Sequence, residues 1–348
     1  MELRPAGPDP THATRRRDAR RRCGLVIGAG AAVGGAWAAG ALCALNETET
    51  FVMTRADVVV GTSAGSVVAV LIAAGMPPQE MFELFSDGDR RLSAAATIPA
   101  EVSGRVRSTL SDIPRPVPIP GNLRLAARTL SQPGCRSMRT AVAALAPRGR
   151  GDLAPIGEMV GEVWGDRGWP VRPRTWLVAM DFDSGRRVPF GAPGEPGTSP
   201  SEAVMASCSV PGLFPPRLIG GRRYVDGGAV SVTNADLLAE EGLDEVVVVA
   251  PMVTPVPGTR RSAAARLGQR LRPQMSQRLR WEVWRLAAAG TSVRVLTPTA
   301  EDVAVMGSDW MDAGQHRRVF QTAMRTTMVQ LAMGEPPSTR CGDVDGVA

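Results

Sequence analysis

The chain has 348 residues, of which 44% are hydrophobic and 21% charged, with a formal net charge of +6. Such a chain can bury the core of one large domain or of two smaller ones, and its composition is that of an ordinary globular protein. Six arginines lie between residues 15 and 22, so the remainder is nearly balanced in charge, and only one Tyr, seven Phe and seven Trp are present to stack on bases. We therefore expect no nucleic-acid partner.

The five cysteines are odd in number and have no C-x-x-C spacing. No His–carboxylate motif typical of a metal site is present, so we expect no disulfide framework, no metal and no cofactor. A reducing cytoplasm fits this pattern. We expect a cytoplasmic protein, with peripheral membrane contact as an open alternative.

Residues 1–22 are rich in Pro, Arg and Asp and lack periodicity, which predicts a disordered basic tail. The tail is either a solvated leader or a segment that touches anionic lipid. A second disordered tail is expected at 334–348. Residues 23–333 are expected to form the folded domain.

Residues 25–27, followed by the glycine-rich stretch 28–35, predict a short strand that runs into a loop and a helix. Backbone N–H groups converge in such loops and bind an oxyanion or a phosphate. The dinucleotide pattern G-x-G-x-x-G fails because Val33 stands where the third glycine belongs. The uncharged run 23–46 could span a bilayer, but its Gly and Ala content disfavours this. We favour an oxyanion loop.

Residues 56–60 predict a buried strand, and residues 66–72 predict an apolar helix. Between them lies Gly-Thr-Ser-Ala-Gly, the G-x-S-x-G pattern of a nucleophile elbow. A side chain at Gly61 or Gly65 would clash in a turn sharp enough to lift the Ser63 hydroxyl to the helix N-terminus. We predict that Ser63 is a nucleophile. The elbow also contains Gly61, Thr62, Ala64 and Gly65.

The elbow helix is expected over 64–75, and another helix over 78–86. Residues 87–150 are rich in Arg, Ser and Pro, and we interpret this irregular segment as a lid or substrate-binding insertion. Within it, the proline-rich run 113–121 is expected to break both helices and strands. Its apolar residues form either an acyl groove or a roof over the core; they are Leu123, Leu125, Leu130 and Met138.

Further along, the pattern predicts a helix over 156–164, a central strand over 176–180 and a hairpin turn at 183–186. A helix over 202–207 with Ser201 as its N-cap follows. Strands are expected over 245–250 and 292–296. The arginine-rich stretch 260–285 predicts a helix despite Pro273, which either lies on an anionic membrane or packs an apolar stripe beneath an exposed basic face. Apolar strands that alternate with helices predict a three-layer α/β/α sandwich around a mainly parallel sheet.

A serine nucleophile needs a base. The chain has no lysine and two histidines, with His12 in the expected tail and His316 on what we expect to be a solvated helix face. We therefore expect no Ser-His-Asp triad and look for a carboxylate. Asp226, at the end of a short strand and before Gly227 and Gly228, is the best candidate, although Asp-Gly-Gly is also a common turn.

The ordered set of a glycine-rich loop, a G-x-S-x-G elbow, the patch 206–216 and D-G-G resembles the patatin-like phospholipase family over residues 23–333. The resemblance implies a Ser63–Asp226 dyad without metal, and an oxyanion hole from the backbone of Gly28, Ala29, Gly30 and Ala31. One departure is that the loop lacks the family's usual Arg or Lys before its last glycine.

The resemblance therefore implies a serine hydrolase that acts on lipid esters, such as a phospholipase A or lysophospholipase, through an acyl-enzyme. Two alternatives stay open: acyl transfer to a lipid acceptor, and lipid binding with weak or no catalysis. The expected partner is a lipid or ester substrate.

Overall fold

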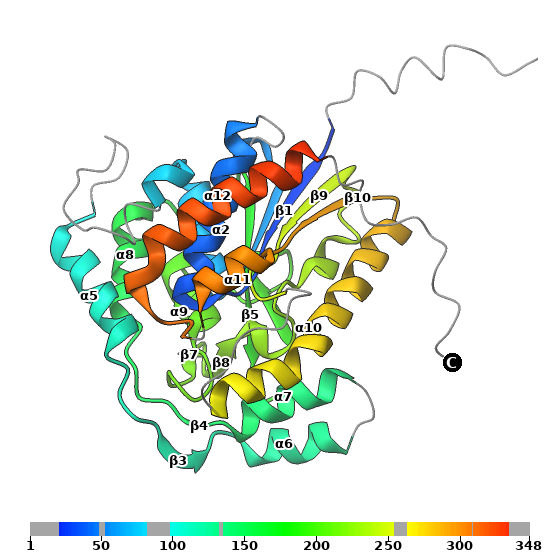
Figure 1. The fold of residues 1–348 in the computed structure, drawn as a ribbon. Coiled ribbons are helices and arrows are strands. Elements are labelled where there is room, and N and C mark those ends of the chain that lie inside the picture. The colour runs from blue at the N-terminus through cyan, green and yellow to red at the C-terminus, as the bar shows by residue number, and fades with distance from the viewer. Residues whose placement is uncertain are drawn as a thin grey trace, which may run out of the picture.

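The computed structural model describes residues 21–48, 53–81, 98–131, 135–253, 263–307 and 309–333. The predicted C-terminal tail and most of the N-terminal one lie outside these ranges. Within them, the chain folds around an eight-stranded sheet in the order β10-β9-β1-β2-β5-β8-β7, with β6 paired to β5 (Figure 1). Its strands are β1 (Cys23–Ile27), β2 (Val58–Thr62), β5 (Arg174–Asp181), β6 (Arg187–Phe190), β7 (Arg217–Ile219), β8 (Arg222–Asp226), β9 (Glu245–Val249) and β10 (Ser292–Leu296).

The sheet is mixed. β10, β9, β1, β2 and β5 run parallel, whereas β6, β8 and β7 are antiparallel to their neighbours. The parallel strands are largely apolar because their side chains alternate between two covered faces. Leu25 and Ile27 pack into the core on one face, and Val26 packs into the core on the other. The three-layer α/β/α prediction is confirmed.

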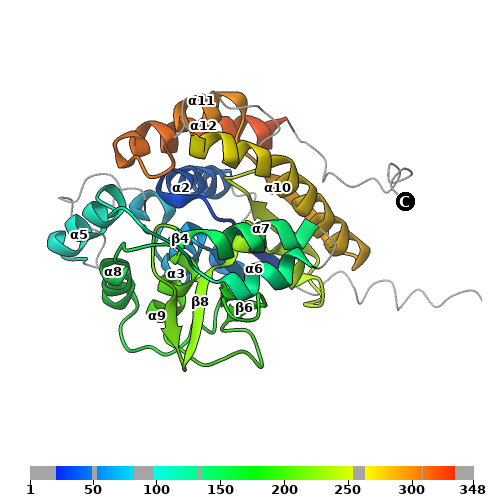
Figure 2. The ribbon, with the colours of Figure 1, turned by 90° about the horizontal axis from the view of Figure 1, so that it is seen from below.

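One face of the sheet is covered by α2 (Ala31–Glu47), α3 (Ala64–Ala73), α8 (Ala154–Trp164), α9 (Pro200–Cys208) and α12 (His316–Ala332). α5 (Ala100–Ser111) packs on α8, and α11 (Ala300–Met306) packs on α12. The other face is covered by α10 (Ala263–Ala288), and by α6 (Leu123–Leu130) and α7 (Cys135–Leu145) near β5 and β8 (Figure 2). Short 3-10 turns are η1 (Met53–Arg55), η2 (Gly227–Ala229), η3 (Ala235–Leu238) and η4 (Ala313–Gln315).

The run 23–46 lies inside the domain, so the membrane-span alternative is wrong. It forms β1, which pairs with β2 and β9, and most of the buried helix α2. No helix in the described ranges is both long enough and apolar enough to cross a bilayer.

The described part of 87–150 is more regular than expected. It holds α5, α6, α7 and a small sheet of β3 (Val117–Pro120) and β4 (Pro147–Arg148). The expectation that 113–121 breaks strands is therefore wrong for 117–120. β3 is an exposed strand of a two-stranded ribbon, so some of its backbone N–H groups have no neighbouring strand to bond. Proline, which lacks this N–H, is therefore tolerated at both of its positions in β3. The role of this segment as a lid stays a prediction.

One smaller expectation is wrong. The N-cap of α9 is Ser199, whose hydroxyl accepts a hydrogen bond from the N–H of Glu202, so the assignment of Ser201 was wrong. Pro200 then occupies the first helical position, which suits its missing N–H. Residues 78–81 are helical, and the rest of the helix expected to residue 86 lies outside the described residues. The hairpin turn at 183–186 is confirmed between β5 and β6.

The helix predicted over 260–285 is confirmed as α10, which continues through Pro273. Its apolar stripe packs on the sheet. Those residues are Met275, Leu279, Val283 and Leu286. In the described part of the helix, this favours a packed basic helix over one that lies on a membrane.

Candidate active site

The G-x-S-x-G segment makes a sharp turn between β2 and α3. Ser63 stands at this turn with φ 56° and ψ −126°, a conformation that is strained for any residue with a side chain. A Cβ atom at Gly61 would lie 2.5 Å from the carbonyl oxygen of Gly65, and one at Gly65 would lie 2.2 Å from that of Ile27. Glycine at both positions therefore permits the turn, which holds Ser63 at the N-terminus of α3.

The backbone of Ser63 is held by α9 and by its own helix. The N–H of Ser63 donates to the hydroxyl of Ser207 at 2.9 Å, and Ser207 donates to the carbonyl oxygen of Val178 at 2.6 Å. The hydroxyl of Ser66 donates to the carbonyl oxygen of Ser63 at 2.6 Å. These bonds stabilise the strained turn. The sequence indicated Ser207 only as part of the patch 206–216, because the residue that it binds, Ser63, lies 144 positions earlier in the chain.

Asp226 lies at the end of β8, beside Ser63. Its carboxylate accepts a hydrogen bond from the N–H of Gly228 at 2.7 Å. The residue is 5% exposed. Burial raises the pKa of Asp226 to about 6, and the nearby Ser63 side chain, the N–H of Gly228 and the charge of Arg139 oppose the rise. The structure thus brings together the serine and the carboxylate that the sequence singled out, although they lie far apart in the chain.

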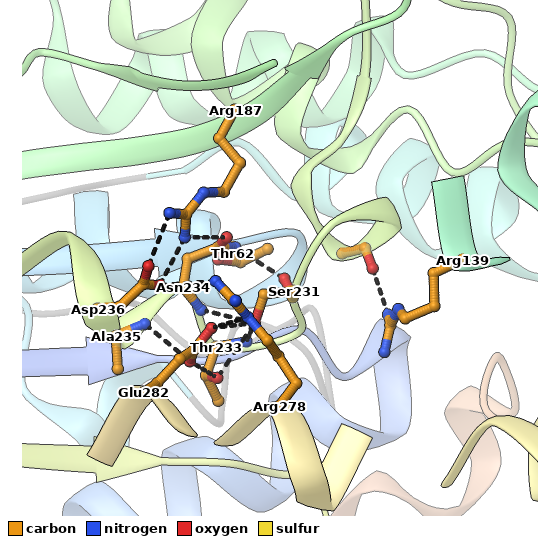
Figure 3. Close-up of polar contacts among 11 residues, drawn as sticks. Thr62, Arg139, Arg187, Ser231, Thr233, Asn234, Ala235, Asp236, Arg278 and Glu282 are labelled. Carbon is orange, nitrogen blue, oxygen red and sulfur yellow. Dashed lines mark hydrogen bonds and ion pairs between the residues drawn. The ribbon is translucent and has the colours of Figure 1, made fainter. Parts of the chain in front are cut away.

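Arg139 reaches the same turn from α7. Its guanidinium donates to the carbonyl oxygen of Gly228 (Figure 3). Burial lowers the pKa of Arg139 to about 10, and the charges of Asp226 and Glu282 oppose this. Arg139 is therefore a cation at neutral pH, and its charge acts on Asp226. No sequence pattern indicated it, because α7 lies in the segment expected to be irregular.

The glycine-rich loop joins β1 to α2. Two of its four predicted oxyanion donors are already engaged, since the N–H of Gly28 donates to Val249 at 2.9 Å and that of Ala29 donates to Val232 at 2.7 Å. Among the described residues, none accepts a hydrogen bond from the N–H of Gly30 or Ala31. Ala31 has φ 51° and begins α2, where helix N–H groups lack intrahelical partners. Gly30 and Ala31 thus remain available as donors.

A cavity lies in front of Ser63. Its volume is about 680 Å³ when the space at its opening to solvent is included. Its two polar side chains are those of Ser63 and His316, and the rest of its wall is apolar. The wall is built by α2, α3, α5, α8, α9 and the segments around 210–214 and 311–316. It includes Ala31, Val67, Val106, Leu110, Leu153, Ile156, Met159, Cys208, Phe214 and Met311. Such a wall suits a hydrocarbon chain.

His316 is buried, so the expectation of a solvated face is wrong. It is 2% exposed and lines the cavity with Ser63. The polar sequence around it suggested a surface, but Val319 and Phe320, one turn further along α12, are also buried and turn that face inward. A histidine therefore does lie in the site, whereas the groups that act on the pKa of Asp226 are Ser63, Gly228 and Arg139.

A buried polar network lies behind the elbow (Figure 3). Glu282 of α10 accepts from the hydroxyls of Ser231 and Thr233, from the N–H of Ala235 and from Arg278. Burial and the charge of Asp236 raise the pKa of Glu282, and Arg278 opposes the rise. The network thus fixes the chain that follows the D-G-G turn.

The same network reaches the elbow and the glycine-rich loop. The side-chain amide of Asn234 donates to the hydroxyl of Thr62, the neighbour of Ser63, at 3.1 Å. The carbonyl oxygen of Val232 accepts the hydrogen bond from Ala29. Asp236, held by Arg187 and Arg278, completes the network. Although burial acts in the opposite direction, Arg187 and Arg278 hold the pKa of Asp236 below its usual value.

The order of these parts along the chain matches a known family. The model of the patatin-like phospholipases matches residues 25–239, which is more than half of the chain. The chain belongs to the patatin-like phospholipase family. The activity that this family implies is the hydrolysis of lipid esters.

Two solved structures align with 90% of this patatin-like chain. VipD from Legionella pneumophila is 15% identical with a TM-score of 0.44, and 67% of its chain is covered. The type III effector protein ExoU is 20% identical with a TM-score of 0.36. The chain spans about half the length of ExoU, 53%.

The patatin-like site has one unusual feature in its glycine-rich loop. Residues 32–35 read Ala-Val-Gly-Gly and carry no basic side chain. Backbone donors do not need one. Within the described ranges, no three His, Cys, Asp or Glu side chains gather in a way that could hold a metal ion. The absence of a metal or cofactor requirement stays a prediction.

Proposed function

We propose that this chain is a lipid acyl hydrolase in which Ser63 is the nucleophile and Asp226 the base. The observation that carries the proposal is the position of Ser63 at the strained turn, where its side chain acts on the buried Asp226 carboxylate and lines an apolar cavity. A serine hydroxyl attacks an ester only when a neighbouring group takes its proton.

In the first step, the Ser63 oxygen forms a bond to the ester carbonyl carbon while its proton moves to Asp226. The carbonyl electron pair moves onto oxygen. Collapse of this intermediate breaks the bond to the alcohol, which leaves with the proton from Asp226. Water then attacks the acyl-enzyme, again with Asp226 as the proton acceptor, and the fatty acid is released as Ser63 is restored.

The pKa of Asp226, about 6, suits this role. The carboxylate is ionised at neutral pH, yet it is a stronger base than an exposed aspartate because burial destabilises its charge. We assign the oxyanion hole to the N–H groups of Gly30 and Ala31. Each such donor commonly contributes ~3 kcal/mol to transition-state stabilisation.

The apolar wall of the cavity favours an acyl chain as the part of the substrate that binds there. Apart from Ser63 and His316, its wall offers hydrocarbon contacts, so a long fatty acyl ester should be preferred over a short one. The head group is left open by this wall, and so is the choice between water and an alcohol as the second acceptor.

The test is a lipid panel with wild type and Ser63→Ala. We expect the variant to lose at least about 10³-fold in turnover, because nothing replaces the nucleophile. Ser292→Ala, an exposed serine of β10, is the matched control and should keep wild-type turnover. Equal turnover in Ser63→Ala and wild type would overturn the proposal. Product analysis with a lysolipid acceptor separates hydrolysis from acyl transfer.

His316 is the competing base, because it lines the same cavity. The two candidates are separated by Asp226→Asn and His316→Ala. With Asp226 as the base, its amide variant should lose about 10²–10⁴-fold, the usual contribution of a general base, and His316→Ala should lose far less. The reverse ranking would transfer the role to His316.

A further inference from the structure

Residues 113–151 form a basic segment of the sequence, and its described residues, 113–131 and 135–151, lie at one end of the molecule. In these 39 positions there is no Asp or Glu. The seven basic residues are Arg115, Arg124, Arg128, Arg136, Arg139, Arg148 and Arg150. β3, β4, α6 and α7 gather at the bottom of Figure 1, and Figure 2 looks onto that end.

The basic segment also exposes large apolar side chains. Six of the eleven large apolar residues that are exposed within the described ranges belong to it. They are Val117 (36%), Ile119 (50%), Leu123 (62%), Leu130 (58%), Met138 (48%) and Leu145 (45%). Exposed apolar residues that gather on one part of a surface mark a contact with another molecule or a membrane, whereas isolated ones do not.

Three arginines of the basic segment are available to a partner. In the described part of the chain, no carboxylate pairs with Arg115, Arg124 or Arg148. Elsewhere many arginines are paired; Arg217 bonds Glu202, and Arg278 bonds Glu282. The contrast with α10 is direct, because that helix is also arginine-rich but buries both its apolar stripe and the Arg278 ion pair.

Both ends of the basic segment reach the cavity wall. Leu110 of α5 precedes it, Leu153 follows it, and both line the cavity. The N–H groups of Arg150 and Gly151 donate to the carbonyl oxygen of Leu213, next to the wall residue Phe214. The two ends of the basic segment therefore adjoin the cavity wall.

We propose that the basic segment docks on the surface of an anionic lipid bilayer. Arginines that lack a carboxylate partner pair with lipid phosphates, and the exposed apolar side chains enter the headgroup boundary. The inference deepens the proposed function and rests on it, because a lipid hydrolase must reach the surface that contains its substrate. A second copy of the chain is the competing occupant, but repulsion between two such basic faces disfavours it.

The experiment measures vesicle flotation of the full chain carrying Ser63→Ala, so that no turnover alters the lipid. Phosphatidylcholine vesicles are compared with vesicles that also contain phosphatidylglycerol. On that background, Arg115→Gln with Arg124→Gln and Arg148→Gln should weaken binding to anionic vesicles by about 100-fold, since each arginine contributes roughly 5-fold. Leu123→Ser with Leu130→Ser should also weaken it. Melting temperatures within ~2 °C of the parent show that the variants fold.

The matched control removes the same charge elsewhere, with Arg172→Gln, Arg280→Gln and Arg318→Gln. These three arginines are exposed and lie outside the basic segment. Binding should persist in this control. Equal loss in both triple variants, or no binding of the parent to anionic vesicles, would overturn the proposal. So would a change in oligomeric state in Leu123→Ser with Leu130→Ser, which would indicate a second copy as the occupant.

The outcomes also separate this proposal from the proposed function. Hydrolysis of a soluble p-nitrophenyl ester by the wild type needs no membrane. If that hydrolysis fails while vesicle binding follows the basic segment, the proposed function is wrong and the docking surface stands. If hydrolysis proceeds and binding does not follow the segment, only the docking surface is wrong.

Discussion

Asp226 and Glu282 are two buried carboxylates whose pKa values are both raised by burial, yet their surroundings differ. Glu282 accepts hydrogen bonds from two hydroxyls, one backbone N–H and one guanidinium. Asp226 accepts from one backbone N–H and lies beside the Ser63 side chain, which lines an open cavity. A buried acid that is surrounded by donors holds structure together, whereas one with a single reactive neighbour can exchange a proton.

Removal of the two acids should therefore have different consequences, for stability at Glu282 and for the reaction at Asp226. Loss of Glu282 should unfold or loosen the molecule, because several donors and Arg278 would be left buried without an acceptor. Loss of the Asp226 charge should affect the reaction and spare the fold, because Asn preserves the acceptor for the N–H of Gly228. Measurements of stability and of activity therefore separate the two sites.

The largest expected effect on stability is that of Glu282→Ala. Breaking a buried ion pair by removing one partner costs about 3–5 kcal/mol of unfolding free energy. Chemical denaturation at neutral pH measures this. Glu240→Ala is the matched control: its side chain is 91% exposed and lies 3.8 Å from Arg285, so it should change the unfolding free energy by less than ~0.5 kcal/mol. Similar costs for the two variants would break the comparison.

Arg139→Met is expected to have a smaller effect, on pH dependence. The charge of Arg139 lowers the pKa of Asp226, so its removal should raise that pKa above about 6. Because the base must be ionised, the rate rises with pH through the pKa, and the acidic limb of the profile should move to higher pH. A pH profile of soluble-ester hydrolysis measures the shift, with the exposed Arg172→Met as the control. A limb that stays in place would show that Arg139 only anchors Gly228.

Local sequence predicted the parts of the site in which neighbours along the chain set the geometry. Gly61, Ser63 and Gly65 form one turn, and the sheet is built from apolar strands. Both features could therefore be predicted from the sequence. Arg139 and Ser207 were not, because their partners lie 89 and 144 residues away. His316 was misplaced because its polar neighbours in sequence concealed a buried helix face.

Hydrogen bonds in the structure also reduce the number of N–H groups that we propose for the oxyanion hole. The sequence pattern does not distinguish among the four residues 28–31 as donors of the oxyanion hole. In the structure, the N–H groups of Gly28 and Ala29 donate to carbonyl oxygens of a strand and a loop. Which N–H groups of the loop remain available depends on the carbonyl oxygens that the fold places beside it. Here those oxygens belong to residues 232 and 249, which are distant in the sequence.

The pH dependence of fluorophosphonate labelling of Ser63 tests the central claim most directly, because it reports activation of the serine without any lipid. In the wild type, labelling should rise with pH through one ionisation near pH 6, as Asp226 loses its proton. In Asp226→Asn, labelling should fall at least about 10²-fold, and the ionisation should vanish. Labelling of Asp226→Asn at the wild-type rate, with the same pH dependence, would contradict the assignment of Asp226 as the base.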